Sequence, residues 1–481
     1  MSRFFVKNLL FVIAVNLLVK PLWVFLVDRN VQNTVGHAEY GTYQALLNLA
    51  LIFNIMLDFG LTYYNTSIIS GAPGKLRTLF PAMLSARMIL VLVYVFIVSI
   101  MAFFIGYSAR EMLMLAGILC IQSLNSLMLF LRSNVAALHK FRLDALLSVA
   151  DRLMMIVLCS VLLFYPPLSS GFKIEWFIWA QVLCYGIAVI IGAVVLRKMA
   201  GVRFAFSLNV QDVTGIVRKS LPYATLVFMM AVHMRADTVL LERLSGVDGK
   251  NFAGIYASAY RLLDVGNMFG IMFSGMLLPM FGRMLAQRHD IQPIVKLSVN
   301  ALLPVAFIAT FAAVFFGTEI MQLLYTHADA YSGQVFAWLM ACFPAYCIMY
   351  IYSTLLTANG SLALLNKVAL VGVVINLSLN IWLIPQQQAL GAARVAFITQ
   401  SVLAMLYIFF SGKKMELPLS QKWLAAHIGF VLMLVAIGYG SRLLHMGWLV
   451  QVSIYTIVGF AMIFLFRFVS VKAIISLADK R

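Results

Sequence analysis

Long apolar runs recur along this chain, beginning at Leu9 and continuing almost to Leu465. A helix needs about 20 mostly apolar residues to cross a bilayer, and these runs reach that length. Lipid offers the backbone no hydrogen-bond partners, so only helices or closed barrels can span it, and these runs are too long and unbroken for barrel strands. The sequence therefore predicts an all-α integral membrane protein.

Hydropathy predicts about fourteen transmembrane helices and leaves little chain outside the membrane. The expected spans are 9–27, 42–64, 82–105, 112–131, 145–165, 175–196, 221–241, 253–280, 297–317, 335–357, 368–385, 391–411, 424–441 and 448–466. The longest segment between them is 197–220, so no loop is large enough to fold as a soluble catalytic module. This argues against a membrane-anchored glycosyltransferase or an ATP-driven pump, and weakens the case for a glycan polymerase or ligase with a sizeable outer loop.

The segment 197–220 divides the chain near its middle, and two matching motifs suggest related halves. Apolar residues alternate along this segment, which does not favour a helix, so we interpret it as a cytoplasmic interfacial linker. Gly41-Thr42-Tyr43 opens the helix after the first span, and Gly254-Ile255-Tyr256 opens the helix after the seventh. Transporter folds are commonly built from two repeats. The expected parts are an N-terminal lobe of six helices at 1–196, the linker, a C-terminal lobe of six helices at 221–411, and a helix pair at 412–481.

The formal net charge of +18 is explained by topology. If the N-terminus is cytoplasmic, 23 of the 35 Lys and Arg residues fall on that side, 6 on the other side and 6 within spans. This bias follows the positive-inside rule and predicts that both termini are cytoplasmic, with no nucleic-acid partner. The five cysteines all fall inside spans, and the chain has no phosphate-binding loop, His-Glu-x-x-His or paired Cys-x-x-Cys motif, so we expect no cofactor, no metal and no enzymatic activity.

Several stretches, taken in order, resemble the Wzx-type polysaccharide flippases of the multidrug/oligosaccharidyl-lipid/polysaccharide exporter superfamily. They are His37 to Ala45 with Leu57 to Leu61, Leu221-Pro222 with Ala236-Asp237, Ala253 to Arg261, and Asn376 to Asn380 with Leu390 to Ala393. The resemblance covers essentially the whole chain, including the last helix pair. It implies two lobes around a central cavity, and alternating access that carries undecaprenyl-pyrophosphate-linked oligosaccharide outward across the bacterial inner membrane.

The resemblance also implies a role in surface polysaccharide synthesis, such as the O-antigen of lipopolysaccharide. Its expected partners are membrane lipids, a polysaccharide polymerase and a chain-length regulator. The same superfamily contains lipid II flippases and cation-coupled multidrug exporters, and both functions stay open here, as does that of a membrane-embedded glycan polymerase or ligase. Drug exporters commonly have twelve helices, and a lipid II flippase is expected to carry arginines in its first helix, where this chain has Lys20-Pro21.

Charged residues inside the spans are the candidate site residues, because a charge at the bilayer centre costs at least about 2.5 to 3.5 kcal/mol and usually faces a cavity or a partner. The embedded cations, which we expect to bind substrate, are Lys20, Arg87, Arg152, Arg235, Arg261 and Arg394. The groups expected to couple transport to an ion are Asp58, Asp151, His233, Asp237 and Asp264. Because the six cations outnumber the four acids, some cations remain available to bind a pyrophosphate. Guanidinium groups bind phosphate oxygens through two parallel hydrogen bonds.

A structural role stays open for most of these residues. Arg261 and Asp264 are three residues apart and are either site groups or an ion pair, whereas the adjacent Asp151 and Arg152 are expected to find separate partners. Lys20 could instead stabilise the kink at Pro21, Arg87 could reach the cytoplasmic surface, and Arg394 could reach the outer headgroups. Asp58 could act as a cap or a hinge, and His233 could simply hydrogen-bond a neighbouring helix.

Overall fold

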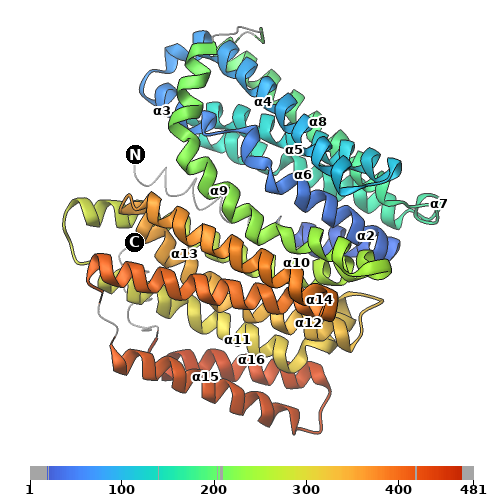
Figure 1. Cartoon of the computed structure of the whole chain (residues 1–481), viewed down its shortest axis with the longest axis vertical. Helices are drawn as coiled ribbons and strands as arrows, with labels where there is room; N and C mark the ends of the chain where they lie inside the picture. Colours follow the sequence, from blue (N-terminus) through green and yellow to red (C-terminus); the bar gives the residue numbers. More distant parts are fainter. Residues whose placement is uncertain are drawn as a thin grey trace. The chain divides into compact units, whose positions relative to one another are not determined.

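The computed structural model of the chain describes residues 19, 21–138, 140–202, 204–205, 210–417 and 420–468. Most of the expected first span lies outside these residues, and so does Lys20. Every regular element within the described ranges is a helix, which confirms the predicted fold class (Figure 1).

The first half of the chain folds into eight α-helices, three short helical turns and their connections. They are η1 (Trp23–Asp28), α2 (Arg29–Ile52), η2 (Asn54–Leu57), α3 (Leu61–Gly71), η3 (Pro73–Lys75), α4 (Leu76–Ile105), α5 (Ala109–Ala137), α6 (Phe141–Phe164), α7 (Pro166–Ser169), α8 (Ile174–Ala200) and α9 (Val210–Leu244). The second half contains η4 (Gly246–Asp248), α10 (Gly249–Ala286), α11 (Gln292–Leu324), α12 (Ala330–Ala341), α13 (Phe343–Ala358), α14 (Leu362–Met415), α15 (Gln421–Arg442) and α16 (Trp448–Leu465).

Eleven helices within the described ranges are long and apolar enough to cross a membrane. One of them, α14, contains two expected spans, because its 54 residues are interrupted at Gln388, three residues after Pro385. The expected span 42–64 is divided between α2 and α3 by an irregular segment. Large apolar side chains such as Leu92, Phe103 and Phe104 are 69 to 79% exposed on α4, which suits a surface that faces lipid.

The chain divides into two compact units, Met1–Glu242 and Arg243–Arg481, which we call unit 1 and unit 2. The division falls near the end of α9. Residues 210–220, which we expected to belong to a linker, form the first turns of α9. The alternating apolar pattern that argued against a helix ends at Val210, where this helix begins. The lobe boundaries expected from the sequence remain a prediction.

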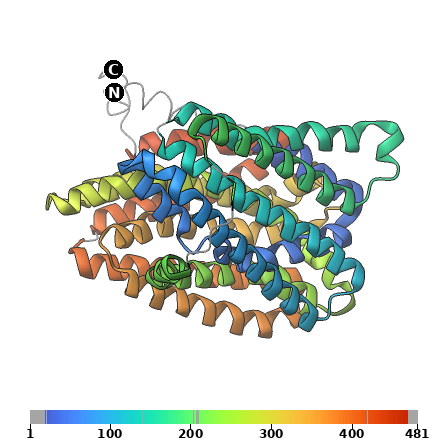
Figure 2. The same ribbon diagram turned by 90° about the horizontal axis from the view of Figure 1, so that it is seen from above.

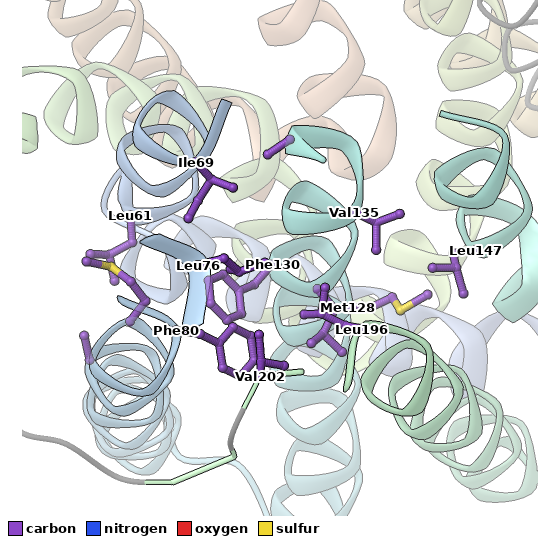
Figure 3. Close-up of a cluster of buried hydrophobic side chains, with 14 of the residues drawn as sticks. Leu61, Ile69, Leu76, Phe80, Met128, Phe130, Val135, Leu147, Leu196 and Val202 are labelled. Carbon is purple, nitrogen blue, oxygen red and sulfur yellow. The ribbon is translucent and has the colours of Figure 1, made fainter. Parts of the chain in front are cut away.

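Unit 1 is a bundle in which α5 packs most extensively on α8, with α2, α3 and α6 also against α5. A cluster of buried apolar side chains fills the space between α4, α5 and α8 (Figure 3). Its centre is the stacked pair Phe80 and Phe130, with ring centroids 5.4 Å apart. Helices gain little hydrophobic energy from one another in lipid, so close van der Waals packing of this kind holds α4 in place.

In unit 2, α10 packs on α13, α11 packs on α12 and α13, and α13 packs on α14. The last helix pair, α15 and α16, lies against α11 (Figure 1). Gly438 makes this contact possible, since a Cβ there would lie 2.1 Å from the Phe315 ring. The Tyr455 hydroxyl on α16 also donates to the Ile308 carbonyl on α11 at 3.2 Å. The long helices of the chain are seen from a second direction in Figure 2.

Candidate functional site

The helix break between α2 and α3 is the starting point of the site in unit 1. The chain leaves α2 at Phe53, forms the short turn η2, and then takes left-handed backbone angles at Phe59 (φ 40°) and Gly60 (φ 81°). A left-handed position suits glycine, which has no Cβ to clash. Irregular backbone at membrane depth is tolerated only where protein covers it or where it lines a cavity.

Asp58 lies inside this break and stabilises the start of α3. Its carboxylate accepts hydrogen bonds from the Gly60 amide at 3.2 Å and the Thr62 amide at 3.1 Å, and also from the Thr62 hydroxyl. Gly60 directly precedes α3 and Thr62 belongs to its first turn, where the backbone N–H groups have no partner within the helix. The capping role that the sequence left open for Asp58 is therefore present in the structure.

Arg87 on α4 reaches the same break and forms an ion pair with Asp58. Its guanidinium also donates to the Thr62 hydroxyl at 2.6 Å, and to the carbonyl and hydroxyl of Ser126 at 2.8 and 2.7 Å. The Arg87 side chain is 1% exposed and its guanidinium lies 5.0 Å from the centre of the Phe130 ring. Arg87 is about 17 Å along α4 from Leu76. The side chain is thus turned into the bundle.

A cavity of about 400 Å³ opens beside this ion pair. Its described lining residues are Asn54, Asp58, Thr62, Arg87, Asn125, Ser126, Leu129, Arg132, Ser133, Ala136 and Asp144. A second ion pair crosses it, from Arg132 on α5 to Asp144 on α6, with the two atoms 2.9 Å apart. We call this space the unit 1 cavity.

The other predicted residues of unit 1 lie on α6 and α9. Asp151 and Arg152 contact one another at 3.7 Å, which their adjacent positions did not predict, and each also has a separate partner, Tyr185 for Asp151 and Trp23 for Arg152. The long Arg152 side chain bends back along the helix, and its guanidinium lies 5.6 Å from the Trp23 ring centre. His233 is buried and its Nδ1 hydrogen-bonds the Met229 carbonyl of its own helix at 3.0 Å, and not a neighbouring helix.

Two more predicted residues lie beside His233 on the same helix. Asp237 is buried at 3% exposure, and Arg235 is half-buried. The His233 imidazole Nε2 has no hydrogen-bond partner among the described residues. The structure thus places this polar cluster inside the bundle without a direct hydrogen bond from the imidazole to Asp237.

In unit 2, the predicted residues occupy two places. Arg261 and Asp264 form an ion pair on α10 with their atoms 3.8 Å apart, which is the structural role that the sequence allowed. Arg394 follows the break in α14, donates to the Gln387 side chain at 2.6 Å, and lies 5.3 Å from the Trp338 ring centre. Its guanidinium is therefore held by protein groups.

The break in α14 is held by Tyr331 on α12. The Tyr331 hydroxyl donates to the Gln387 carbonyl and accepts from the Leu390 amide, both at 3.1 Å. Gly391 follows directly, and a Cβ there would lie 2.6 Å from the Leu383 carbonyl oxygen. The Leu390 to Ala393 stretch that carried part of the family resemblance is therefore a close backbone contact at a helix break.

A charged cluster at the helix ends of unit 1 was missed by sequence reasoning. Arg110 at the start of α5 binds both oxygens of Glu39 at 2.8 Å and one oxygen of Glu175 at 2.7 Å, and so joins α2, α5 and α8. Close by in sequence, the Tyr107 hydroxyl donates to buried Glu242 on α9 at 2.7 Å. Hydropathy placed these residues in loops or at span ends. Only their positions at neighbouring span ends could have indicated the contact.

Unit 2 contains an apolar groove formed by α11, α13, α14 and α15. Two adjoining cavities of about 340 and 420 Å³ share Val299, Tyr352, Ile408 and Trp423. The first cavity ends at Lys296 and Lys413, whereas the second is lined almost wholly by apolar side chains. We call this the unit 2 groove.

The described part of the chain contains no cluster of three or more His, Cys, Asp or Glu residues that could hold a metal ion. The five cysteines are free thiols, and four of them are buried.

The family model for polysaccharide biosynthesis proteins matches residues 5–285, more than half of the chain. The chain belongs to this family. No curated protein matches the sequence. Among solved structures, the lipid II flippase MurJ in an inward closed conformation matches with a TM-score of 0.71 and 14% identity, covering 98% of this chain and 100% of that one.

Multidrug transporters share the fold over less of the chain. An inward-facing MATE family transporter of the MOP superfamily matches with a TM-score of 0.62 and 13% identity, covering 81% of this chain and 93% of that one. The Vibrio cholerae MATE transporter VcmN in its bent form matches with a TM-score of 0.56 and 13% identity, covering 85% of this chain and 97% of that one. The shared fold confirms the predicted all-helical, multi-pass architecture of about fourteen transmembrane helices.

Proposed function

We propose that this family member flips undecaprenyl-pyrophosphate-linked oligosaccharide repeat units across the bacterial inner membrane. The observation that carries the proposal is the unit 1 cavity, which is lined by two arginines, two aspartates and several amides and hydroxyls. Charged groups at membrane depth mark the routes of polar substrates. The family match over 5–285 and the fold shared with a lipid II flippase along 98% of the chain support it.

The substrate of such a flippase has an anionic pyrophosphate, a polar glycan and a long polyprenyl chain. The unit 2 groove offers an apolar surface for a lipid chain, with Lys296 and Lys413 at one end for a phosphate. The proposed substrate-binding cations are Lys20, Arg87, Arg152, Arg235, Arg261 and Arg394. Three of them, Arg87, Arg152 and Arg261, already contact a carboxylate, so a polar group of the substrate would have to exchange with that carboxylate.

This exchange suggests how transport is coupled to an ion. Protonation of Asp58 would release the Arg87 guanidinium. Protonation of Asp151 would release Arg152 in the same way, and protonation of Asp264 would release Arg261. The same proposal assigns proton or cation coupling to His233 and Asp237. Alternating access of two lobes, 1–196 and 221–411, around a central cavity would then carry the headgroup across, with 412–481 as an accessory helix pair.

The proposal includes the cellular setting. Both termini are cytoplasmic by the 23-to-6 distribution of Lys and Arg over the two sides. The exported repeat units would be joined by a polysaccharide polymerase, with a chain-length regulator, into O-antigen or another surface polysaccharide.

Single neutralising substitutions in cells test the proposal. Arg152→Gln, Arg235→Gln and Arg261→Gln should each abolish surface glycan while protein levels in the membrane stay normal. Arg142→Gln, at an exposed position near the start of α6, is the matched control and should export normally. Normal export by all three variants would contradict the basic-site mechanism. Drug efflux without glycan export would favour a multidrug exporter, and joining of sugar chains by purified protein in detergent would favour a polymerase or ligase.

A further inference from the structure

The unit 1 cavity has an unusual balance of charge for a site expected to bind a pyrophosphate. Its described lining contains two arginines and two aspartates, and each arginine is paired with one aspartate. Nine of the eleven lining residues are polar, and only Leu129 and Ala136 are apolar. The described lining therefore carries no net charge.

A phosphate group fits this lining poorly. Ionised phosphate and carboxylate oxygens only accept hydrogen bonds, so a phosphate in the cavity could not hydrogen-bond to Asp58 or Asp144. It would also be repelled by their negative charges. To reach the Arg87 guanidinium it would have to displace Asp58 and leave that carboxylate unpaired. A pyrophosphate binds better where cations are in excess.

A sugar hydroxyl fits the same lining well, because it donates one hydrogen bond and accepts others. The cavity presents carboxylate acceptors, the Asn125 and Asn54 amides, and the hydroxyls of Ser126 and Ser133. The volume of about 400 Å³ lies within the range of about 300 to 1,000 Å³ that is usual for small-molecule sites.

We infer that the unit 1 cavity binds uncharged sugar hydroxyls of the lipid-linked glycan and not its pyrophosphate. The inference rests on the proposed function and adds to it a division of labour. Glycan recognition falls to the Asp58–Arg87 and Arg132–Asp144 cavity, and the anionic group is bound elsewhere.

Two lipids that differ only in the glycan test this division. The probes are the undecaprenyl-pyrophosphate glycan extracted from the source cells and bare undecaprenyl pyrophosphate. The Kd of each is measured for the purified full-length chain in nanodiscs. Asn125→Ala removes a lining amide that belongs to neither ion pair. It should weaken binding of the glycan lipid about threefold to tenfold, the value of one hydrogen bond, and leave the bare lipid within about twofold.

Ser133→Ala is a second variant at the cavity, and its hydroxyl donates to the Phe130 carbonyl of its own helix at 2.8 Å. Asn251→Ala makes the same chemical change as Asn125→Ala at an exposed position on α10 and should alter neither Kd. Equal weakening of both probes by the cavity variants would place the pyrophosphate in the cavity and overturn the inference. Unchanged binding of both probes would remove the cavity from recognition. Failure of the wild-type chain to bind the glycan lipid would instead refute the proposed function, and the inference with it.

Discussion

The Asp58–Arg87 ion pair makes an asymmetric prediction about stability. The Arg87 side chain is 1% exposed, whereas that of Asp58 is 33% exposed. Asp58→Asn leaves a guanidinium buried without a counter-charge, which typically costs about 3 to 5 kcal/mol. Arg87 keeps three hydrogen bonds, to Thr62 and twice to Ser126, so the expected loss in free energy of unfolding is at the lower limit, about 3 kcal/mol.

Arg87→Met should be milder, because it removes the buried charge and keeps an apolar stem of similar length. Asp58 still accepts from the Gly60 amide, the Thr62 amide and the Thr62 hydroxyl, and is partly exposed. The expected loss is about 1 to 2 kcal/mol. The double variant contains neither charge and should be no less stable than Arg87→Met alone. The sum of the two single losses should therefore exceed the loss of the double variant by about 3 kcal/mol or more.

The measurement is unfolding of the purified full-length chain by SDS titration in mixed micelles, with the wild type and all three variants in one series. Asn251→Ala, which lies on α10 and outside the ion pair, serves as the control for purification and reconstitution, and its free energy of unfolding should match that of the wild type. Additive single losses, or a larger loss for Arg87→Met than for Asp58→Asn, would refute the claim that the buried cation depends on Asp58.

The same titration tests three further sites. Gly391→Ala should lower the free energy of unfolding by about 1 to 3 kcal/mol, because the new Cβ would lie 2.6 Å from the Leu383 carbonyl oxygen. Gly412→Ala on the same helix is the control and should be neutral or stabilising, because the nearest atom to its Cβ would lie at 3.8 Å. Equal effects of the two substitutions would contradict the close contact at Gly391. Tyr331→Phe removes both hydrogen bonds across the α14 break and should cost about 1 to 2 kcal/mol, and an unchanged midpoint would show that the break needs no such support. Arg110→Gln should lower the free energy of unfolding by only about 0.2 to 1 kcal/mol, since the side chain is 55% exposed. This loss should be smaller in about 0.5 M salt, and a loss that does not depend on salt would argue against an electrostatic cause.

Hydropathy was sufficient for the fold because the bilayer forces each spanning segment to satisfy its backbone internally. Apolar runs of about 20 residues therefore become helices wherever they occur. The same argument is weak at breaks. The segment around Asp58 and Gly60 lay inside an expected continuous span, and only the structure shows that α2 ends at Ile52 and α3 begins at Leu61.

Helical spacing indicated the Arg261–Asp264 pair, but it could not indicate the partner of Arg87. Arg87 and Asp58 are 29 residues apart in sequence, so no helical spacing connects them. The count of six cations against four acids also left out Arg132 and Asp144, which hydropathy placed in a loop and the structure places on the cavity. Pairing between helices depends on tertiary packing, which a single sequence does not reveal.

Translocation by the purified protein is the most direct test of the central claim. The full-length chain is reconstituted in liposomes that carry the undecaprenyl-pyrophosphate glycan of the source cells only in the inner leaflet. Arrival of the glycan in the outer leaflet is followed by cleavage with a membrane-impermeant glycosidase. The proposed function predicts protein-dependent cleavage that is lost in Arg261→Gln and retained in Arg142→Gln. Cleavage no faster than in protein-free liposomes, with the protein folded and inserted, would contradict the assignment as a flippase of lipid-linked glycans.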